Sequence, residues 1–225
     1  MRAADPNLPY LRCIAEALGE LREQFVFVGG AVAGLLVTDP LADSVRATRD
    51  VDAVVNASRI MFHDIEQKVA ERGFVRDASS DVICRWVHKE SSILFDLMPV
   101  EPEVLGFSNR WYPYAVQTAV PVDLGAGITI RLIDAVAFVA TKLEAFVSRG
   151  RGDFLSSHDL EDVLNIVDGR AELPHEMASA PFELRQAVSR VFSLLLANRN
   201  FENVLPGLIA EPERADLILE RLRSL

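Results

Sequence analysis

Hydrophobic and polar positions change their spacing along the chain, and this change divides it into two parts. Up to residue 132, short apolar runs rich in β-favouring residues alternate with stretches of helical spacing. Strands are predicted over 25–28, 50–55, 73–77, 82–88, 93–98, 115–122 and 127–132, and helices over 8–23, 31–37 and 58–72. The last two strands should form a hairpin around Leu124–Gly127. We therefore expect residues 1–132 to form a mixed β-sheet with flanking helices.

From residue 133 onward the strand pattern stops and only helical spacing remains. Helices are predicted over 134–147, from about 158 to 167, over 181–197 and over 212–222. Gly150 and Gly152 should end the first of these, and Ser156 or Ser157 should cap the second. The expected class is thus α+β, with a sheet-containing core at 1–132 and a helical C-terminal part at 133–225.

Composition excludes several classes of protein. Half of the 225 residues are hydrophobic and a quarter are charged, which excludes wholesale disorder, collagen and coiled-coil arrays. The formal net charge of -10 excludes a basic footprint over the whole surface, although a local patch that includes Arg149 and Arg151 remains open. Cys13 and Cys84 stand among apolar neighbours and are expected to be reduced. Without a signal-peptide pattern or an apolar run of membrane-spanning length, we expect a soluble cytoplasmic protein with no membrane partner.

Asp50 and Asp52 carry the clearest chemical signal. Strand side chains alternate between faces, so the two carboxylates should point the same way, about 7 Å apart along the strand. Like charges on one face of an apolar strand are costly unless a cation neutralises them, and hard divalent cations prefer carboxylate oxygens. The alternative is that both residues lie at the solvated end of the strand.

Two further features strengthen the metal hypothesis. Gly29 and Gly30 follow a strand and precede a helix, an arrangement that lets backbone N–H groups approach a phosphate, although a tight turn alone also explains it. Asp96 lies in the middle of an apolar strand and needs a partner, but no cation stands near it in the sequence. If its strand lies beside Asp50 and Asp52, three carboxylates can hold two metal ions for in-line displacement at phosphorus.

In this order, these motifs resemble the polymerase-beta-type nucleotidyltransferase superfamily, which has a glycine turn, a later Asp-x-Asp and a third Asp on a neighbouring strand. The stretch Arg46-Ala47-Thr48-Arg49-Asp50-Val51-Asp52 is similar to the Arg-x-Thr-x-Asp-x-Asp stretch of AbiEii-type nucleotidyltransferases. That group includes toxins of toxin–antitoxin pairs. It also has a helix that carries a Lys and a later pair of Asp, which match Lys142, Asp159 and Asp162. His158 stands where the group often has Lys or Arg.

The resemblance implies roles for particular residues. Asp50, Asp52 and Asp96 would hold Mg²⁺ or Mn²⁺, with Asp96 also the nearest base. Nucleotide binding would fall to Gly29, Gly30, Thr48 and Lys142, with Asp159 orienting the Lys142 ammonium. We expect Lys142 and Asp159 to face the same cleft as the three aspartates, and the variant Lys142→Ala to lose activity while keeping its thermal stability.

The implied reaction transfers a nucleoside monophosphate from an NTP such as ATP to an acceptor hydroxyl and releases pyrophosphate. The acceptor stays open between a tRNA 3′ end, a protein and a small molecule such as an aminoglycoside, and a toxin role would imply an antitoxin partner. The alternative from another class is a non-catalytic module that binds a nucleotide or a partner on the same fold. The filled Asp triad favours the enzyme.

Overall fold

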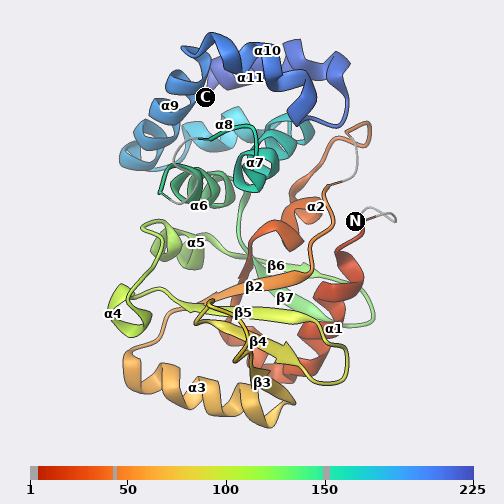
Figure 1. Ribbon diagram of the computed structural model, residues 1–225, viewed down its shortest axis with the longest axis vertical. Helices are drawn as coiled ribbons and strands as arrows, with labels where there is room; N and C mark the ends of the chain where they lie inside the picture. Colours follow the sequence, from red (N-terminus) through yellow and green to blue (C-terminus); the bar gives the residue numbers. More distant parts are fainter. Residues whose placement is uncertain (1–4, 43–44, 149–152) are drawn as a thin grey trace. The chain divides into compact units, whose positions relative to one another are not determined.

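A computed structural model describes residues 5–42, 45–148 and 153–225, and its internal contacts separate the chain into two compact units (Figure 1). The first, called here the sheet unit, comprises Met1–Val32 and Arg46–Asp134. The second, the helical unit, comprises Ala33–Val45 and Ala135–Leu225. The short segment that leaves the sheet unit after Val32 therefore belongs with the helices, whereas the sequence division placed it with the sheet.

A mixed sheet forms the sheet unit, as the alternating pattern predicts. Its seven strands among the described residues run in the order β3-β4-β5-β2-β1-β7-β6. The pairs β2–β5 and β1–β7 are parallel and the other neighbours are antiparallel. The strands are β1 (Val26–Val28), β2 (Asp50–Val55), β3 (Phe74–Arg76), β4 (Arg85–His88), β5 (Leu94–Pro99), β6 (Val120–Asp123) and β7 (Thr129–Leu132). The α+β prediction is confirmed.

The core of the sheet unit lies against the face of β5 that carries Phe95. The Phe95 ring lies 6.2 Å from the ring centre of Phe25 and 5.5 Å from that of Phe74, and all three side chains are fully buried. Neighbouring residues of a strand point to opposite faces. The packing of Phe95 therefore directs Asp96 to the other face of the sheet.

The helices of the sheet unit bury the apolar residues that predicted them, but some of them end at other residues than predicted. In α1, Leu11, Ile14 and Leu18 are buried, but the α-helix ends at Gly19, whose φ of +57° suits glycine. The predicted helix over 8–23 thus becomes an α-helix followed by a 3-10 helix. The helical elements are α1 (Leu8–Leu18), η1 (Gly19–Gln24), η2 (Gly30–Val32), α3 (Arg59–Glu71), α4 (Pro102–Leu105) and α5 (Tyr112–Thr118).

The strand prediction over 115–122 is wrong for its first half. Residues 112–118 form α5, and β6 begins only at Val120. Pro113 lies in the first turn of α5, where its fixed φ suits a helix and its missing N–H costs no hydrogen bond. The second half is confirmed, because β6 and β7 pair antiparallel and Gly125 and Gly127 take positive φ in the turn between them.

The helical unit is built around α6, which is buried along nearly its whole length and contacts α7, α8 and α9. Ser157 caps α7 by accepting a hydrogen bond from the Leu160 N–H at 3.2 Å, as predicted. Arg149–Gly152 lie outside the described residues. The helices are α2 (Ala33–Leu36), α6 (Ala135–Ser148), α7 (His158–Gly169), α8 (Leu173–Ala178), α9 (Phe182–Leu196), α10 (Arg199–Leu208), η3 (Pro212–Arg214) and α11 (Ala215–Ser224). Within the described ranges, no helix has the length and apolar character needed to cross a membrane.

Hydrogen bonds explain why the segment after Val32 joins the helical unit. The N–H groups of Thr38 and Asp39 both donate to the carbonyl oxygen of Gly169 at 2.9 Å. Arg214 bridges Asp39 and Asp168 at 3.0 and 2.6 Å. Apart from the Arg214–Asp168 pair, which spans 46 positions, these contacts join residues more than a hundred positions apart. No local pattern reveals them.

Candidate functional site

Three carboxylates meet on one face of the sheet. Asp50 and Asp52 both come from β2, and Asp96 is the register partner of Asp52 on the adjacent parallel strand β5. One carboxylate oxygen from each residue lies within 4.8 Å of the other two. Asp96 is buried, whereas Asp50 and Asp52 are half-buried. The three aspartates that the sequence proposed are thus brought together by the pairing of β2 with β5.

This donor set fits a hard divalent cation. Its ligand atoms are all carboxylate oxygens, the type that Mg²⁺ and Mn²⁺ prefer. Carboxylates this close repel one another when they are ionised, and the side chain of Asp96 is buried. A metal ion at Asp50, Asp52 and Asp96 would relieve that repulsion.

A cation that the sequence analysis missed also lies at this cluster. Arg85 of β4 is the register partner of Asp96 across the antiparallel pair β4–β5. Its Nε donates to Asp96 Oδ1 at 2.9 Å, and its Nη2 donates to Asp96 Oδ2 at 2.7 Å and to Asp50 Oδ2 at 3.3 Å. The hydrogen bonds to Asp96 are the main cause of a raised pKa for the Arg85 guanidinium. Asp96 therefore does have a cationic partner, eleven residues earlier in the chain.

Gly29 lies directly against the Asp52 carboxylate of this cluster. It follows β1, where Val28 pairs with Asp52, and its φ is +73°. A Cβ atom at Gly29 would clash with Asp52 Oδ2, so the Asp52 carboxylate packs directly over this glycine. Positive φ and close approach both require glycine here. The predicted helix after Gly30 is shorter than expected, being a 3-10 turn and the four-residue α2, and the phosphate role of the two glycines stays a prediction.

The variant Gly29→Ala tests whether this close approach positions Asp52. We expect Mn²⁺ affinity to fall by about tenfold to a hundredfold, the usual effect of disturbing the support of a metal ligand. Gly127→Ala is a matched control, because Gly127 has a φ of +75° but a Cβ added there would meet nothing within 4 Å. Both variants carry the backbone strain of alanine at positive φ, about 1–2 kcal/mol. Equal Mn²⁺ affinities in the two variants would contradict the positioning role.

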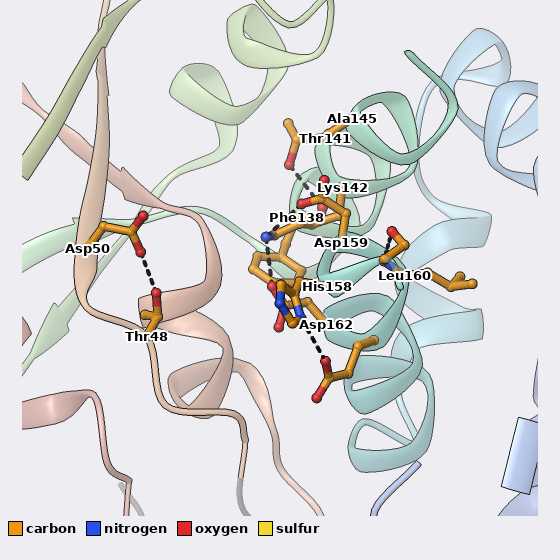
Figure 2. Close-up of polar contacts among 12 residues, drawn as sticks. Thr48, Asp50, Phe138, Thr141, Lys142, Ala145, His158, Asp159, Leu160 and Asp162 are labelled. Carbon is orange, nitrogen blue, oxygen red and sulfur yellow. Dashed lines mark hydrogen bonds and ion pairs between the residues drawn. The ribbon is translucent and has the colours of Figure 1, made fainter. Parts of the chain in front are cut away.

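Thr48 contacts the cluster through Asp50. Its hydroxyl donates a hydrogen bond to Asp50 Oδ1, as Figure 2 shows. The Thr48 N–H donates to Asn7 Oδ1 at 2.9 Å, and Asn7 Nδ2 donates to the Arg46 carbonyl at 2.9 Å. Asn7 is fully buried, and through these two hydrogen bonds it fixes the backbone of the segment before β2. The nucleotide-binding role predicted for Thr48 stays a prediction, whereas its contact with Asp50 is direct.

Cys84 precedes Arg85, and its thiol lies near the charges of the acidic cluster. Burial, followed by the charges of Asp96 and Asp52, raises the pKa of the Cys84 thiol to about 12. Cys13 and Cys84 are both free, in agreement with the expectation of reduced cysteines.

A second charged cluster lies in the helical unit. Lys142 of α6 extends toward α7, where its Nζ lies 3.0 Å from Asp159 Oδ1 and 2.7 Å from Asp162 Oδ2 (Figure 2). The Lys142 side chain is only 13% exposed and that of Asp162 only 2%. Asp162 therefore pairs with Lys142. Arg149 and Arg151, the candidates for a local basic patch, lie outside the described residues. The roles of Lys142 and Asp159 toward a nucleotide stay predictions.

This burial changes the expectation for stability. The expectation that Lys142→Ala keeps its thermal stability treated Lys142 as a residue outside the packed core. Lys142 is instead held between two carboxylates, one of them buried, so its removal leaves Asp162 without its nearest cation.

Comparisons with known proteins find a structure of similar fold but no matching protein family. No protein-family profile matches the chain, and no curated protein matches it significantly in sequence. Among solved structures, the chain is similar to an antigenic nucleotidyltransferase-like protein from Paracoccidioides brasiliensis, with a TM-score of 0.51 and 17% sequence identity. The match covers 92% of this chain and 94% of that one. The chain therefore has a nucleotidyltransferase-like fold, and its acidic triad lies on two adjacent strands of the sheet.

Proposed function

We propose that this protein is a metal-dependent nucleotidyltransferase that transfers a nucleoside monophosphate from an NTP to an acceptor hydroxyl. The observation that carries the proposal is the meeting of Asp50, Asp52 and Asp96 within 4.8 Å of one another, in a chain of nucleotidyltransferase-like fold. Arg85 donates to Asp96, Thr48 donates to Asp50, and Gly29 leaves room for Asp52, so each carboxylate has a supporting neighbour, as expected for a preorganised site.

In the proposed reaction, the acceptor oxygen forms a bond to the α-phosphorus while the bond from that phosphorus to the leaving pyrophosphate breaks. Bound Mg²⁺ would supply charge stabilisation and lower the pKa of the acceptor hydroxyl. Asp50 and Asp52, which both lie on β2, would present their carboxylate oxygens to the metal ion. Asp96 receives the acceptor proton, since each of its oxygens keeps a lone pair beside the hydrogen bond from Arg85.

We further propose that the enzyme is of the AbiEii type. The support is the stretch from Arg46 to Asp52, in which the Thr hydroxyl contacts the first Asp of the Asp-x-Asp pair. This assignment gives a tRNA 3′ end or a protein hydroxyl as the acceptor and a neutralising antitoxin as a partner. The net charge of -10 favours the protein acceptor, because phosphate contacts would depend on local arginine patches alone.

The test is to incubate the purified protein with each α-labelled NTP and Mg²⁺ or Mn²⁺, in separate mixtures that contain total RNA, total cell protein or an aminoglycoside. We expect label to enter one macromolecular fraction and pyrophosphate to be released, and the variant Asp52→Asn to show neither. Label on an aminoglycoside alone would identify a small-molecule transferase and contradict the AbiEii assignment. Binding of NTP without pyrophosphate release in any mixture would contradict the enzyme and favour the non-catalytic module.

A further inference from the structure

Asn7 stands directly before α1, at a position where an asparagine usually caps the helix. A capping side chain accepts a hydrogen bond from a backbone N–H two or three residues ahead. In the part of the chain that the structure describes, the Asn7 side chain makes no such bond to α1. Asn7 is nevertheless fully buried, and a buried amide needs hydrogen-bond partners. Helix capping therefore does not explain this side chain.

The partners of the Asn7 amide lie in the segment that leads into the acidic triad. Its Nδ2 donates to the carbonyl oxygen of Arg46, and its Oδ1 accepts from the N–H of Thr48, both at 2.9 Å. A residue of a parallel strand bonds to its partner strand in the same pattern. The pairing of β2 with β5 begins only at Asp50. Asn7 therefore does for residues 46–48 what a neighbouring strand does for β2.

The backbone of Asn7 is itself anchored. Its N–H donates to Asp5 Oδ1 at 2.9 Å, and its carbonyl oxygen accepts from the Leu11 N–H at 3.0 Å in the first turn of α1. Leu11 is fully buried in the sheet unit. The amide that binds residues 46 and 48 is thus carried by the fixed end of a packed helix.

Thr48 connects this amide to the triad. Its N–H is held by Asn7, and its hydroxyl donates to Asp50 Oδ1, the contact drawn in Figure 2. Threonine is β-branched, so its χ1 has few rotamers and the direction of its hydroxyl depends on its backbone. A backbone fixed at residue 48 therefore limits where the hydroxyl can hold the Asp50 carboxylate.

We propose that Asn7 is a positioning residue of the metal site. It fixes Thr48, and the Thr48 hydroxyl holds the Asp50 carboxylate in the orientation that binds a divalent cation. This inference rests on the proposed function, because it concerns the metal ion that the triad would hold. Hydrogen-bond partners behind a metal ligand typically contribute about tenfold to a hundredfold to metal affinity.

Mn²⁺ affinity of the nucleotide-free protein is the readout, because electron paramagnetic resonance distinguishes bound from free Mn²⁺. Asn7→Leu keeps roughly the volume of the side chain and removes both of its hydrogen bonds, whereas Thr48→Val removes only the hydroxyl. Each variant should bind Mn²⁺ more weakly, on the order of tenfold. Because Asn7 acts through Thr48, the double variant should bind Mn²⁺ about as well as Thr48→Val alone.

Arg22→Met is the matched control. Arg22 donates to the carbonyl oxygens of Thr129 and Gly19 at 3.0 and 2.6 Å, so it also joins two segments of the sheet unit through their backbone. Thr129 begins β7 and precedes the residues that pair with β1, whereas Asp52 pairs with the last residue of β1. The variant should have a lowered Tm, as Asn7→Leu should, but the Mn²⁺ affinity of the unmodified protein.

Equal Mn²⁺ affinities of Asn7→Leu and the unmodified protein would overturn the inference and leave the proposed function intact. Losses that multiply in the double variant would also overturn it, since Asn7 would then not act through Thr48. If Asn7→Leu fails to fold, Thr48→Val decides: unchanged Mn²⁺ affinity overturns the inference, and a tenfold loss supports it. Absence of Mn²⁺ binding in every form would overturn both the inference and the proposed function.

Discussion

Replacing Asp52 by asparagine is expected to lower nucleotide transfer by about a thousandfold or more, equivalent to roughly 4 kcal/mol of barrier. Asparagine keeps the shape that packs over Gly29 but loses the charge that a metal ion requires. The fold should persist, since removing one of three repelling carboxylates does not weaken it. The measurement is label transfer at saturating Mg²⁺, together with a thermal unfolding curve.

Asp64→Asn provides the control for this prediction. Asp64 is an exposed aspartate of α3 in the same unit, so its substitution makes the same chemical change away from the triad. Its transfer rate should match that of the unmodified protein. Full metal-dependent transfer by Asp52→Asn would show that the triad does not hold the metal.

The second large effect is on stability rather than on chemistry. Lys142→Met should lower the free energy of unfolding by about 3–5 kcal/mol, because it leaves the Asp162 carboxylate buried without its nearest cation. Adding Asp162→Asn to the same chain should recover most of this loss, since both charges are then gone. Urea unfolding, followed by a signal from the helical unit, measures the change.

Lys68→Met is the control, because Lys68 is exposed near the end of α3 and its removal should change stability by no more than about 0.5 kcal/mol. A Lys142→Met variant as stable as Lys68→Met would mean that the buried ion pair contributes nothing. The double variant also separates folding from catalysis. If it is stable and yet transfers no nucleotide, the predicted nucleotide contact of Lys142 is supported.

Several features of the site follow from local rules and could be predicted. Asp50 and Asp52 share a face because strand side chains repeat every two residues. Glycine at position 29 is required by a local turn, and Ser157 caps α7 through an N–H three residues ahead. Each of these depends on residues close together in the chain, where backbone geometry leaves few arrangements.

Other predictions were limited by ambiguity in the local pattern. The run from Ala115 to Val122 has apolar residues that suit either a short helix or a strand, and only its packing decided between them. For Asp96, the sequence indicated the need for a partner but not its identity. Counting back across the hairpin between β4 and β5 from the pair Val87–Leu94 leads to Arg85, but this requires the register to be known.

By itself, the sequence determined the class of fold, the face shared by Asp50 and Asp52, and the change from sheet to helices near residue 133. Only the tertiary structure decided that β2 lies beside β5, that Arg85 binds Asp96, that Asn7 clamps the segment before Asp50, and that Asp162 pairs with Lys142. The physical reason is that periodicity and capping are local, whereas strand register and buried ion pairs join residues distant in the chain and depend on the packing of the whole unit.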